Sequence, residues 1–212
     1  MQNKYPNFLL VDHPLVKKDI TILRDETTKP DTFREAVKRI STVLAVNISS
    51  DFLLSTFKVK TPLEQTKGFS LKQEIVLVPV LRAGLGMVSG FLAIIPDAKV
   101  GHIGLERNEK TLKPAEYYNK TPRNIDSSEV ILLDPMLATG GSASSAISFL
   151  KKRGAKKIVF ACLVAAPEGI KKLSADHPEI KIFSAALDRK LNNRGYILPG
   201  LGDAGDRTFG TL

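Results

Sequence analysis

The sequence contains one cysteine and three histidines among its 212 residues. A single cysteine, Cys162, excludes an internal disulfide and is typical of a protein from the reducing cytoplasm. Because Cys162 lies within an apolar run, we predict a buried structural thiol there, and a nucleophile is the less favoured alternative. None of the three histidines falls in the glycine-rich motifs described below. The sequence therefore indicates no histidine that could act as a general base.

Long apolar segments are also absent. The longest uncharged apolar run, residues 83–96, is too short to cross a bilayer and contains three glycines. No basic and apolar leader opens the sequence, so we expect no export signal. We find no internal repeat and no low-complexity segment. At this length, these absences favour one cytoplasmic globular domain over residues 1–212, with no membrane partner.

Basic residues outnumber acidic ones, and the formal charge of +9 predicts an attraction to anions. Five of the basic residues gather around the end of one predicted helix, where cations suit the helix dipole. They are Lys151, Lys152, Arg153, Lys156 and Lys157. No aromatic residues alternate with them, as a platform for single-stranded nucleic acid requires. We interpret the cluster as a solvated helix end, and nucleic-acid binding is the less favoured alternative.

The central motif is a glycine loop between two periodic segments. An apolar run at 130–133 ends at Asp134, and apolar residues recur at helical spacing over 143–150. This change of period predicts a buried strand that leads into an amphipathic helix. Backbone N–H groups around Gly140 and Gly141, with those of the first helical turn, form a surface that favours a phosphate. A carboxylate beside an anion site suits hydroxyl groups or magnesium, so we predict a sugar phosphate as ligand.

A glycine loop by itself is weak evidence, because an ordinary glycine turn has the same composition. The lysine that follows the last glycine of a nucleotide-triphosphatase loop is missing here. Gly200, Gly202 and Gly205 have the spacing of a dinucleotide fingerprint, but that fingerprint must open a helix within a βαβ unit. Only seven residues follow Gly205. We therefore exclude both of these familiar nucleotide loops.

A second unit of strand, glycine loop and helix precedes the first. A buried strand is predicted over 74–80, the sequence L-R-A-G-L-G follows it, and the helical period restarts at Val88. Arg82 comes at the carboxyl end of this strand, where open parallel sheets bind their ligands. The guanidinium fork suits diphosphate oxygens. A peripheral ion pair is the alternative for Arg82.

The remaining segments also alternate between strands and helices. We predict a loosely held arm over 1–10, a helix over 14–24, and a helix that begins with a capping box at Thr32 and Glu35. Turn-rich extended segments at the sheet edge are predicted over 58–71. Further strands are expected at 99–105, 158–165 and 180–187, with a short helix from Pro167. This alternation predicts an α/β protein with a parallel sheet.

Two polar segments are candidates for ligand contacts. Residues 107–123 are too polar for the core and too long for a tight turn, so we predict a projecting flap with Arg107 at its root. Residues 195–211 are rich in glycine and contain Asp203. Glycine lets the backbone approach a flat ligand, so exposed N–H and C=O groups can read a heterocycle without side chains. A flexible terminus is the alternative for this segment.

Four blocks together resemble uracil phosphoribosyltransferases, and they stand at residues 81–87, 134–142, 165–170 and 195–206. Residues 13–16 and 23–25 fit that family too, so the resemblance covers almost the whole chain in the right order. It implies a type I phosphoribosyltransferase-like α/β fold, a parallel sheet flanked by helices. It further implies an N-terminal helical extension at 1–50, a β flap at 107–123 and a base-binding C-terminal hood at 188–212.

The activity that this resemblance implies is a pentosyl transfer in pyrimidine salvage. Uracil and 5-phosphoribosyl 1-diphosphate (PRPP) would give uridine monophosphate (UMP) and diphosphate. The resemblance also implies magnesium as cofactor, GTP as an allosteric activator, and a homodimer or homotetramer in the cytoplasm. Nucleic acid is not an expected partner.

The resemblance assigns roles to individual residues. Arg82, Arg107 and Asp203 would have catalytic roles, the two arginines at the diphosphate and Asp203 near the ribose and magnesium. Asp134 would face the ribose hydroxyls. The PRPP site would also include Pro135, Met136, Leu137, Ala138, Thr139, Gly140, Gly141 and Ser142, of which the last five hold the 5′-phosphate. Uracil would be bound by Ile197, Gly202, Asp203 and Ala204, largely through their backbone.

The chain departs from the common pattern at a few positions. Pro135 follows Asp134 where most phosphoribosyltransferase loops carry a second acid, a difference that the uracil family shares. Further departures, outside the substrate motifs, are Val46, Asn47, Asn193 and Arg194. A regulatory relative that binds nucleotides and RNA remains an alternative, although intact substrate motifs count against it. A phosphoribosyltransferase for another base, such as a purine, is disfavoured by the length and backbone character of the tail.

Overall fold

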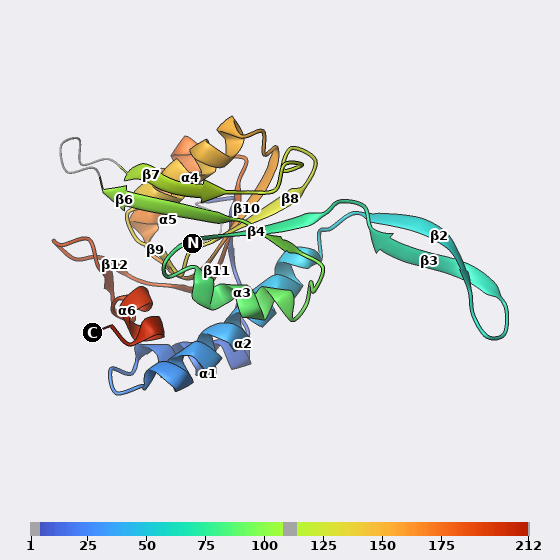
Figure 1. Cartoon of the computed structure of the whole chain (residues 1–212). Helices are drawn as coiled ribbons and strands as arrows, with labels where there is room; N and C mark the ends of the chain where they lie inside the picture. The colour runs from blue at the N-terminus through green and yellow to red at the C-terminus, as the bar shows by residue number, and fades with distance from the viewer. Residues whose placement is uncertain (1–4, 108–113, 212) are drawn as a thin grey trace.

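The computed structural model describes residues 5–107 and 114–211. Within them, a mostly parallel nine-stranded sheet forms the centre and helices cover both of its faces (Figure 1). Its main path runs in the order β1 (Phe8–Leu10), β11 (Lys181–Leu187), β10 (Lys157–Ala165), β8 (Glu129–Leu133), β4 (Ile75–Leu81), β6 (His102–Arg107) and β7 (Pro114–Lys120). Short strands β5 (Lys99–Val100) and β9 (Met136–Leu137) pair with β4 and β10. The predicted α/β fold is confirmed.

The central strands are apolar throughout because the sheet is buried on both faces. Helices α1 (Pro14–Arg24), α2 (Pro30–Ser49) and α3 (Leu85–Leu92) share one core with strand residues such as Leu77 and Leu133. Helices α4 (Gly141–Lys152) and α5 (Pro167–Asp176) share the other core with the alternate residues Val78 and Leu132. The alternation of each strand therefore divides its side chains between two helical layers.

The chain changes direction across the sheet between β4 and β8. Strand β8 lies beside β4 on one side, whereas β6, which precedes β8 in the sequence, lies on the other. Pro79 and Leu133 are register partners near the carboxyl ends of β4 and β8. The loops that follow these strands therefore border the crevice where open α/β sheets bind ligands.

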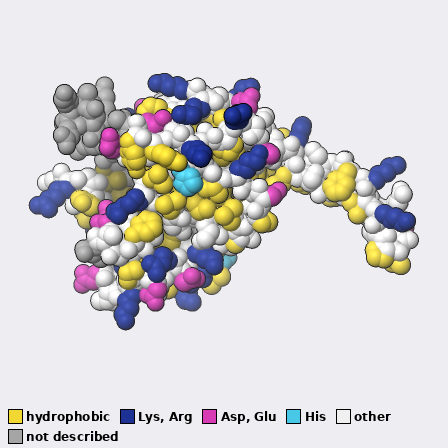
Figure 2. Space-filling model, in the orientation of Figure 1, with side chains coloured by type: hydrophobic (Ala, Val, Ile, Leu, Met, Phe, Trp, Pro, Cys, Tyr) yellow, Lys and Arg dark blue, Asp and Glu magenta, His cyan; other side chains and the backbone are white. Residues whose placement is uncertain are grey.

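The segment predicted at the sheet edge forms a separate hairpin, so that prediction was wrong. Strands β2 (Leu54–Lys60) and β3 (Gln65–Leu71) pair with each other along their whole length and project from the body of the molecule (Figures 1 and 2). Because each strand satisfies the hydrogen bonds of the other on that side, neither needs the main sheet. Phe57 and Phe69 are more than half exposed on this hairpin.

Two predictions near the N-terminus were also wrong. Residues 8–10 are not part of a loose arm, because they form β1 in parallel pairing with β11 and bury Phe8. Helix α2 begins at Pro30 with Lys29 as its N-cap, so Thr32 and Glu35 form no capping box. Proline fixes φ close to the helical value, so α2 begins two residues before Thr32, whose hydroxyl indicated a later start.

The flap and the C-terminal segment complete the chain. Strands β6 and β7 form an antiparallel hairpin in the region predicted as a flap, and residues 108–113 lie outside the described residues. The tail contains β12 (Lys190–Leu191), β13 (Ile197–Leu198) and α6 (Ala204–Phe209), which lies near the N-terminal helices (Figure 1). The domain boundaries predicted from sequence stay predictions. None of the described helices is long and apolar enough to span a membrane.

Candidate active site

The predicted phosphate loop leads from β9 into the N-terminus of α4. Gly140 is the N-cap residue and has a φ of 79°, in the left-handed region that favours glycine. A Cβ at Gly140 would lie 2.8 Å from the carbonyl oxygen of Gly169, so the loop packs tightly on α5. No side chain caps α4, and its first turn contains no acidic residue. The helix N-terminus is therefore suited to an anion.

Asp134 stands at the carboxyl end of β8, between the sheet and this loop. Its Oδ1 accepts a hydrogen bond from the N–H of Met136 at 3.3 Å. Burial raises the pKa of the Asp134 carboxyl to about 7, and the Met136 hydrogen bond offsets part of that effect. No ion pair to Asp134 occurs among residues 5–107 and 114–211. A carboxyl without a cationic partner is suited to hydroxyl groups or a metal ion.

Cys162 lies beneath this region and is fully buried. Burial, with a smaller contribution from Asp134, raises the pKa of the thiol to about 12. A thiol that stays protonated is a poor nucleophile, so the structural interpretation holds.

Arg82 follows β4 directly and reaches the tail. Its Nη2 donates to Asp206 Oδ1 at 2.9 Å, and its guanidinium lies 5.9 Å from the ring centroid of Phe209. The ion pair that the sequence left open for Arg82 is thus present, and it joins the crevice to α6. The Arg82 side chain remains more than half exposed, so further donors are accessible to a ligand.

Arg107 is the last residue of β6, and its backbone pairs with Pro114 at the end of the β6–β7 hairpin next to residues 108–113, rather than at the root of the hairpin as predicted. Its side chain lies outside what the structure describes. The predicted contact of Arg107 with diphosphate therefore stays a prediction.

The predicted uracil residues belong to a tightly bent segment. Ile197 is the first residue of β13 and is buried in the core, and Gly202 has a φ of 78°. Asp203 is the N-cap of α6, and its Oδ1 accepts a hydrogen bond from the N–H of Asp206 at 2.9 Å. Gly202 and Asp203 are exposed, whereas Ala204 is buried. The backbone around residues 202–203 is accessible to a ligand.

Three segments far apart in sequence meet here. A Cβ at Gly195 would lie 3.7 Å from Thr139 Cγ2, which places the tail beside the phosphate loop. A Cβ at Gly205 would lie 3.2 Å from Asp203 Oδ1 and 3.9 Å from Arg82 Nη2. The tail therefore contacts both of the glycine loops that follow the carboxyl ends of β4 and β8.

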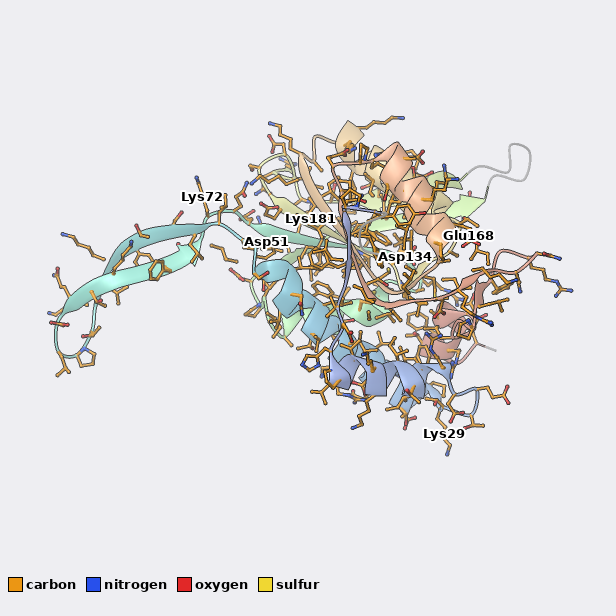
Figure 3. The ribbon with its side chains drawn as sticks, turned by 180° about the vertical axis from the view of Figure 1, so that it is seen from behind. Lys29, Asp51, Lys72, Asp134, Glu168 and Lys181 are labelled. Carbon is orange, nitrogen blue, oxygen red and sulfur yellow. The ribbon has the colours of Figure 1, made fainter. Side chains whose placement is uncertain are left out.

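Several polar residues near the site were not predicted to act there. Figure 3 shows Asp134 and Glu168 on the side of the core that faces the tail, and Glu168 Oε1 accepts the backbone N–H of Leu191 at 3.0 Å. Arg24 and the buried Asp188 form an ion pair that contacts Gly200 of the tail. Asp188, like Asp134, is an acidic residue directly after a buried strand. That position in the sequence could have identified Asp188 as a candidate site residue.

His13, His177 and two lysines of the basic cluster make local contacts that belong to the fold. His13 accepts a hydrogen bond from Leu15 N–H at the start of α1. His177 is buried at the end of α5, and its Nδ1 lies 2.9 Å from Nζ of Lys151. Lys151 and Lys157 of the basic cluster also pair with Glu179 and Glu129. These contacts favour a helix-end role for the cluster.

Comparisons with known proteins agree with this geometry. The model of the family described as uracil phosphoribosyltransferase matches residues 10–211. A uracil phosphoribosyltransferase from Finegoldia magna is 54% identical over 94% of this chain and 96% of its own length. One from Salinibacter ruber is 50% identical over 97% of this chain and 98% of its own.

Solved structures share the fold of this chain. A protein from Aquifex aeolicus superposes with a TM-score of 0.89 at 38% identity, covering 95% of this chain and 97% of its own. A hypoxanthine phosphoribosyltransferase from Trypanosoma cruzi shares the fold at 13% identity and a TM-score of 0.53, covering 74% of this chain and 75% of its own. With its fold, its two glycine loops and its tail all accounted for, this chain belongs to the uracil phosphoribosyltransferase family.

Proposed function

We propose that this enzyme, a pentosyltransferase, transfers the phosphoribosyl group of PRPP to N1 of uracil and releases UMP and diphosphate. The observation that carries the proposal is the meeting of the tail with both glycine loops around Arg82 and Thr139. A phosphate cradle, a diphosphate-binding arginine and an exposed backbone segment are what this reaction needs in one crevice. The names of the close relatives support uracil as the base.

The chain's own groups suggest how each part of PRPP is held. Residues 138–142 would bind the 5′-phosphate through the N-terminus of α4. Asp134 would accept hydrogen bonds from the ribose hydroxyls. Arg82 would bind the diphosphate, with Arg107 added from the flap. Ile197, Gly202, Asp203 and Ala204 would border the uracil, with most of the recognition by backbone groups.

The reaction breaks the bond from C1 of the ribose to the diphosphate and forms a bond from C1 to N1 of uracil. Positive charge develops at C1 and negative charge on the diphosphate, so the arginines stabilise the leaving group. Holding uracil and ribose in line removes much of the entropic cost of bringing them together. We assign no side chain as general base, and we propose that the N1 proton leaves with the diphosphate.

Magnesium fits this site as a partner of the substrate rather than as a metal held by the protein alone. Among the described residues, no group of three or more histidine, cysteine or acidic side chains could hold a metal ion. The second oxygen of Asp203 is the candidate contact, because Oδ1 already caps α6. A bound magnesium ion would supply positive charge to the diphosphate.

We also propose that the chain forms a homodimer or homotetramer, works in the cytoplasm and is activated by GTP. The exposed apolar residues Phe57, Leu63 and Phe69 of the β2–β3 hairpin support self-association, because such patches mark interaction surfaces. The single buried cysteine supports a reducing compartment. Sedimentation of the wild type and of a Phe57→Asp/Phe69→Asp variant tests the assembly, and a monomeric wild type contradicts it.

The activity is tested with the purified protein, PRPP, magnesium and each nucleobase in turn. We expect nucleotide from uracil alone. Nucleotide from a purine would replace uracil in the proposal. An absence of turnover together with tight, salt-sensitive RNA binding would favour a regulatory, non-catalytic protein.

A further inference from the structure

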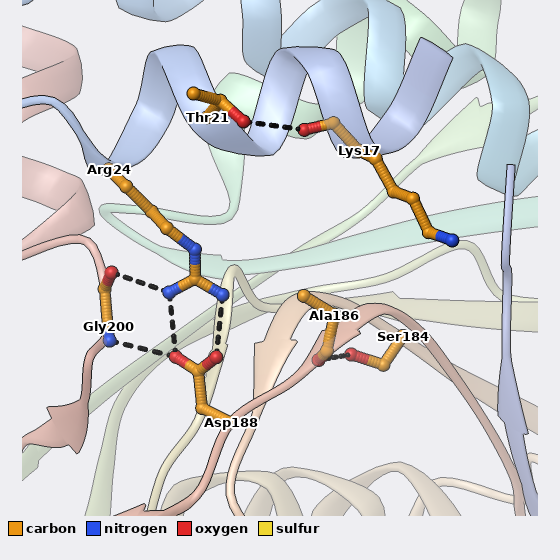
Figure 4. Close-up of polar contacts among 7 residues, drawn as sticks. All are labelled: Lys17, Thr21, Arg24, Ser184, Ala186, Asp188 and Gly200. Atoms are coloured by element: carbon orange, nitrogen blue, oxygen red, sulfur yellow. Dashed lines mark hydrogen bonds and ion pairs between the residues drawn. The ribbon is translucent and has the colours of Figure 1, made fainter. Parts of the chain in front are cut away.

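A partly buried ion pair between Arg24 and Asp188 contacts the tail. Arg24 is the last residue of α1 and Asp188 follows β11, so the two are 164 residues apart in the sequence. Arg24 Nη1 and Nη2 donate to the two carboxylate oxygens of Asp188 at 3.0 and 2.6 Å (Figure 4). The side chain of Asp188 is only 3% exposed. This is a bidentate pair, the geometry in which arginine and a carboxylate orient each other best.

Both members of the pair also bind the same residue of the tail. Arg24 Nη1 donates to the carbonyl oxygen of Gly200 at 2.8 Å, and the N–H of Gly200 donates to Asp188 Oδ2 at 2.8 Å (Figure 4). The guanidinium and the carboxylate therefore hold the acceptor and the donor of one glycine. Gly200 has a φ of 67°, and a Cβ there would lie 2.2 Å from the carbonyl oxygen of Ile197.

Gly200 stands in the middle of the segment assigned to uracil, with Ile197 before it and residues 202–204 after it. The backbone on both sides has its own attachments. Arg189 N–H donates to the carbonyl oxygen of Leu198 at 3.0 Å, and the buried Arg207 donates to that of Leu201 at 2.8 Å. Arg207 also donates to the carbonyl oxygens of Leu23 and Asp25, at the end of α1. The end of α1 thus supports the bend in the tail.

Recognition by backbone makes such support necessary. A side chain can adjust its rotamer to a ligand, whereas a backbone N–H or C=O moves only if the chain moves. Misplacement by about 1 Å, even from a residue far from the chemistry, can cost an enzyme about 100-fold in rate. Groups that fix the supporting shell therefore control binding without contacting the ligand.

We propose that Arg24 and Asp188 are positioning residues for the nucleobase, which act through Gly200 to hold the backbone of residues 197–204 in the arrangement that receives uracil. This inference rests on the proposed function. The phosphate loop is held separately, by the contact of Gly140 with Gly169 and by the pairing of β9 with β10. Loss of the pair should therefore impair uracil binding and leave PRPP binding nearly unchanged.

The chain offers a matched control in Arg39 and Asp19. Arg39 Nε and Nη2 donate to the two oxygens of Asp19 at 2.9 and 2.7 Å, and Asp19 is buried. This bidentate pair joins α1 to α2 and has no hydrogen bond to the tail within the described residues 188–211. Arg24→Met and Arg39→Met therefore each leave a buried aspartate without its arginine partner.

The experiment measures the KM for uracil, the KM for PRPP, kcat and the thermal midpoint of the wild type and both variants. We expect Arg24→Met to raise the KM for uracil by about tenfold or more, because the backbone that binds the base shifts. Its KM for PRPP should stay within about twofold of the wild type. Arg39→Met should lower the thermal midpoint while leaving both KM values unchanged.

Arg24→Lys adds a graded test and replaces Arg24→Met if that variant does not fold. An ammonium keeps the charge but cannot reproduce the fork that contacts both Asp188 and Gly200, so the KM for uracil should rise by an intermediate amount. Equal effects on the two KM values, or equal effects of the Arg24 and Arg39 variants, would overturn the positioning role. A wild type without activity toward uracil would instead overturn the proposed function, and this inference with it.

Discussion

Arg82 and Asp206 form an ion pair of 2.9 Å that connects the loop after β4 to the helix α6 near the end of the chain. Hydrogen bonds from Thr211 and Arg82 hold the pKa of Asp206 below its ordinary value, so this carboxylate is charged at neutral pH. A diphosphate that binds Arg82 must share the guanidinium with Asp206 or displace it. The tail, which we propose to border the base, is thereby linked to the arginine that we assign to the leaving group.

Replacing Arg82 tests this assignment. We expect Arg82→Ala to lower kcat/KM for PRPP by about 100-fold, the usual order for removing a group that stabilises developing charge. Steady-state kinetics with PRPP as the varied substrate provides the measurement. Asp206→Asn is the control, because it removes the ion pair but keeps the arginine, and we expect it to retain most of the activity. If both variants lose activity equally, the ion pair rather than the arginine is what the enzyme needs.

Gly140→Ala tests the phosphate loop. The added Cβ meets the carbonyl oxygen of Gly169 at 2.8 Å and has an unfavourable φ, so the start of α4 must shift. We expect the KM for PRPP to rise by about tenfold or more, because misaligned N–H groups no longer fit a phosphate. Gly154→Ala is the control, since Gly154 also has a positive φ, 99°, but lies at the far end of α4. An unchanged KM in Gly140→Ala would remove the loop from the phosphate site.

The carboxyl of Asp134 predicts a specific pH dependence of stability. Its pKa is raised from 3.8 to about 7 by burial, so between these values the folded state binds more protons than the unfolded state. This stabilising contribution is complete below pH 3.8 and is lost as the pH rises through 7. We therefore expect Asp134→Asn to gain stability relative to the wild type over that interval.

Chemical denaturation of both proteins at several pH values from 4 to 8 measures this difference directly. Other carboxyls, such as Glu74 with its lowered pKa, contribute with the opposite sign. They are present in both proteins and cancel in the comparison. A difference in unfolding free energy that stays constant from pH 4 to 8 would show that Asp134 titrates normally.

Asp203→Asn separates the proposed catalytic role of this residue from its structural role. Asparagine caps helices about as well as aspartate, so α6 and the thermal midpoint should be preserved. The negative charge that we propose to lie near the ribose and magnesium is lost, and we expect kcat to fall by about 100-fold. Turnover and thermal melting of the same preparation provide the test. Undiminished turnover would exclude an essential role for Asp203.

Much of the candidate site could be predicted because the sequence patterns that indicate it lie within a few neighbouring residues. Gly140 is needed by a left-handed backbone position, and the apolar residues over 143–150 reveal the helix that follows it. Likewise, Arg82 and Asp134 stand directly after buried strands, where the ends of parallel strands share one edge of the sheet. The capping box at Thr32 failed because a proline two residues earlier had already set the first turn of α2.

Strand pairing between segments could not be predicted in this way, because no local sequence pattern indicates the partner. Neither strand of the β2–β3 hairpin carries a pattern that tells whether it joins the main sheet or pairs only with its neighbour. Residues 8–10 are too short a run to predict a strand, and they form one because β11 offers an open edge. In both cases hydrogen-bond partners, rather than local preference, decide the outcome.

The sequence by itself determined the alternation of strands and helices through the body of the chain, the left-handed glycine at the start of α4 and the glycine-rich character of the tail. These depend on periodicity and on glycine conformations within a few neighbouring residues. Only the tertiary structure decided that Arg82 meets Asp206, and that Arg24 and Asp188 hold Gly200. Each of these contacts joins parts of the chain that come together only when α1, the sheet and the tail pack around one core.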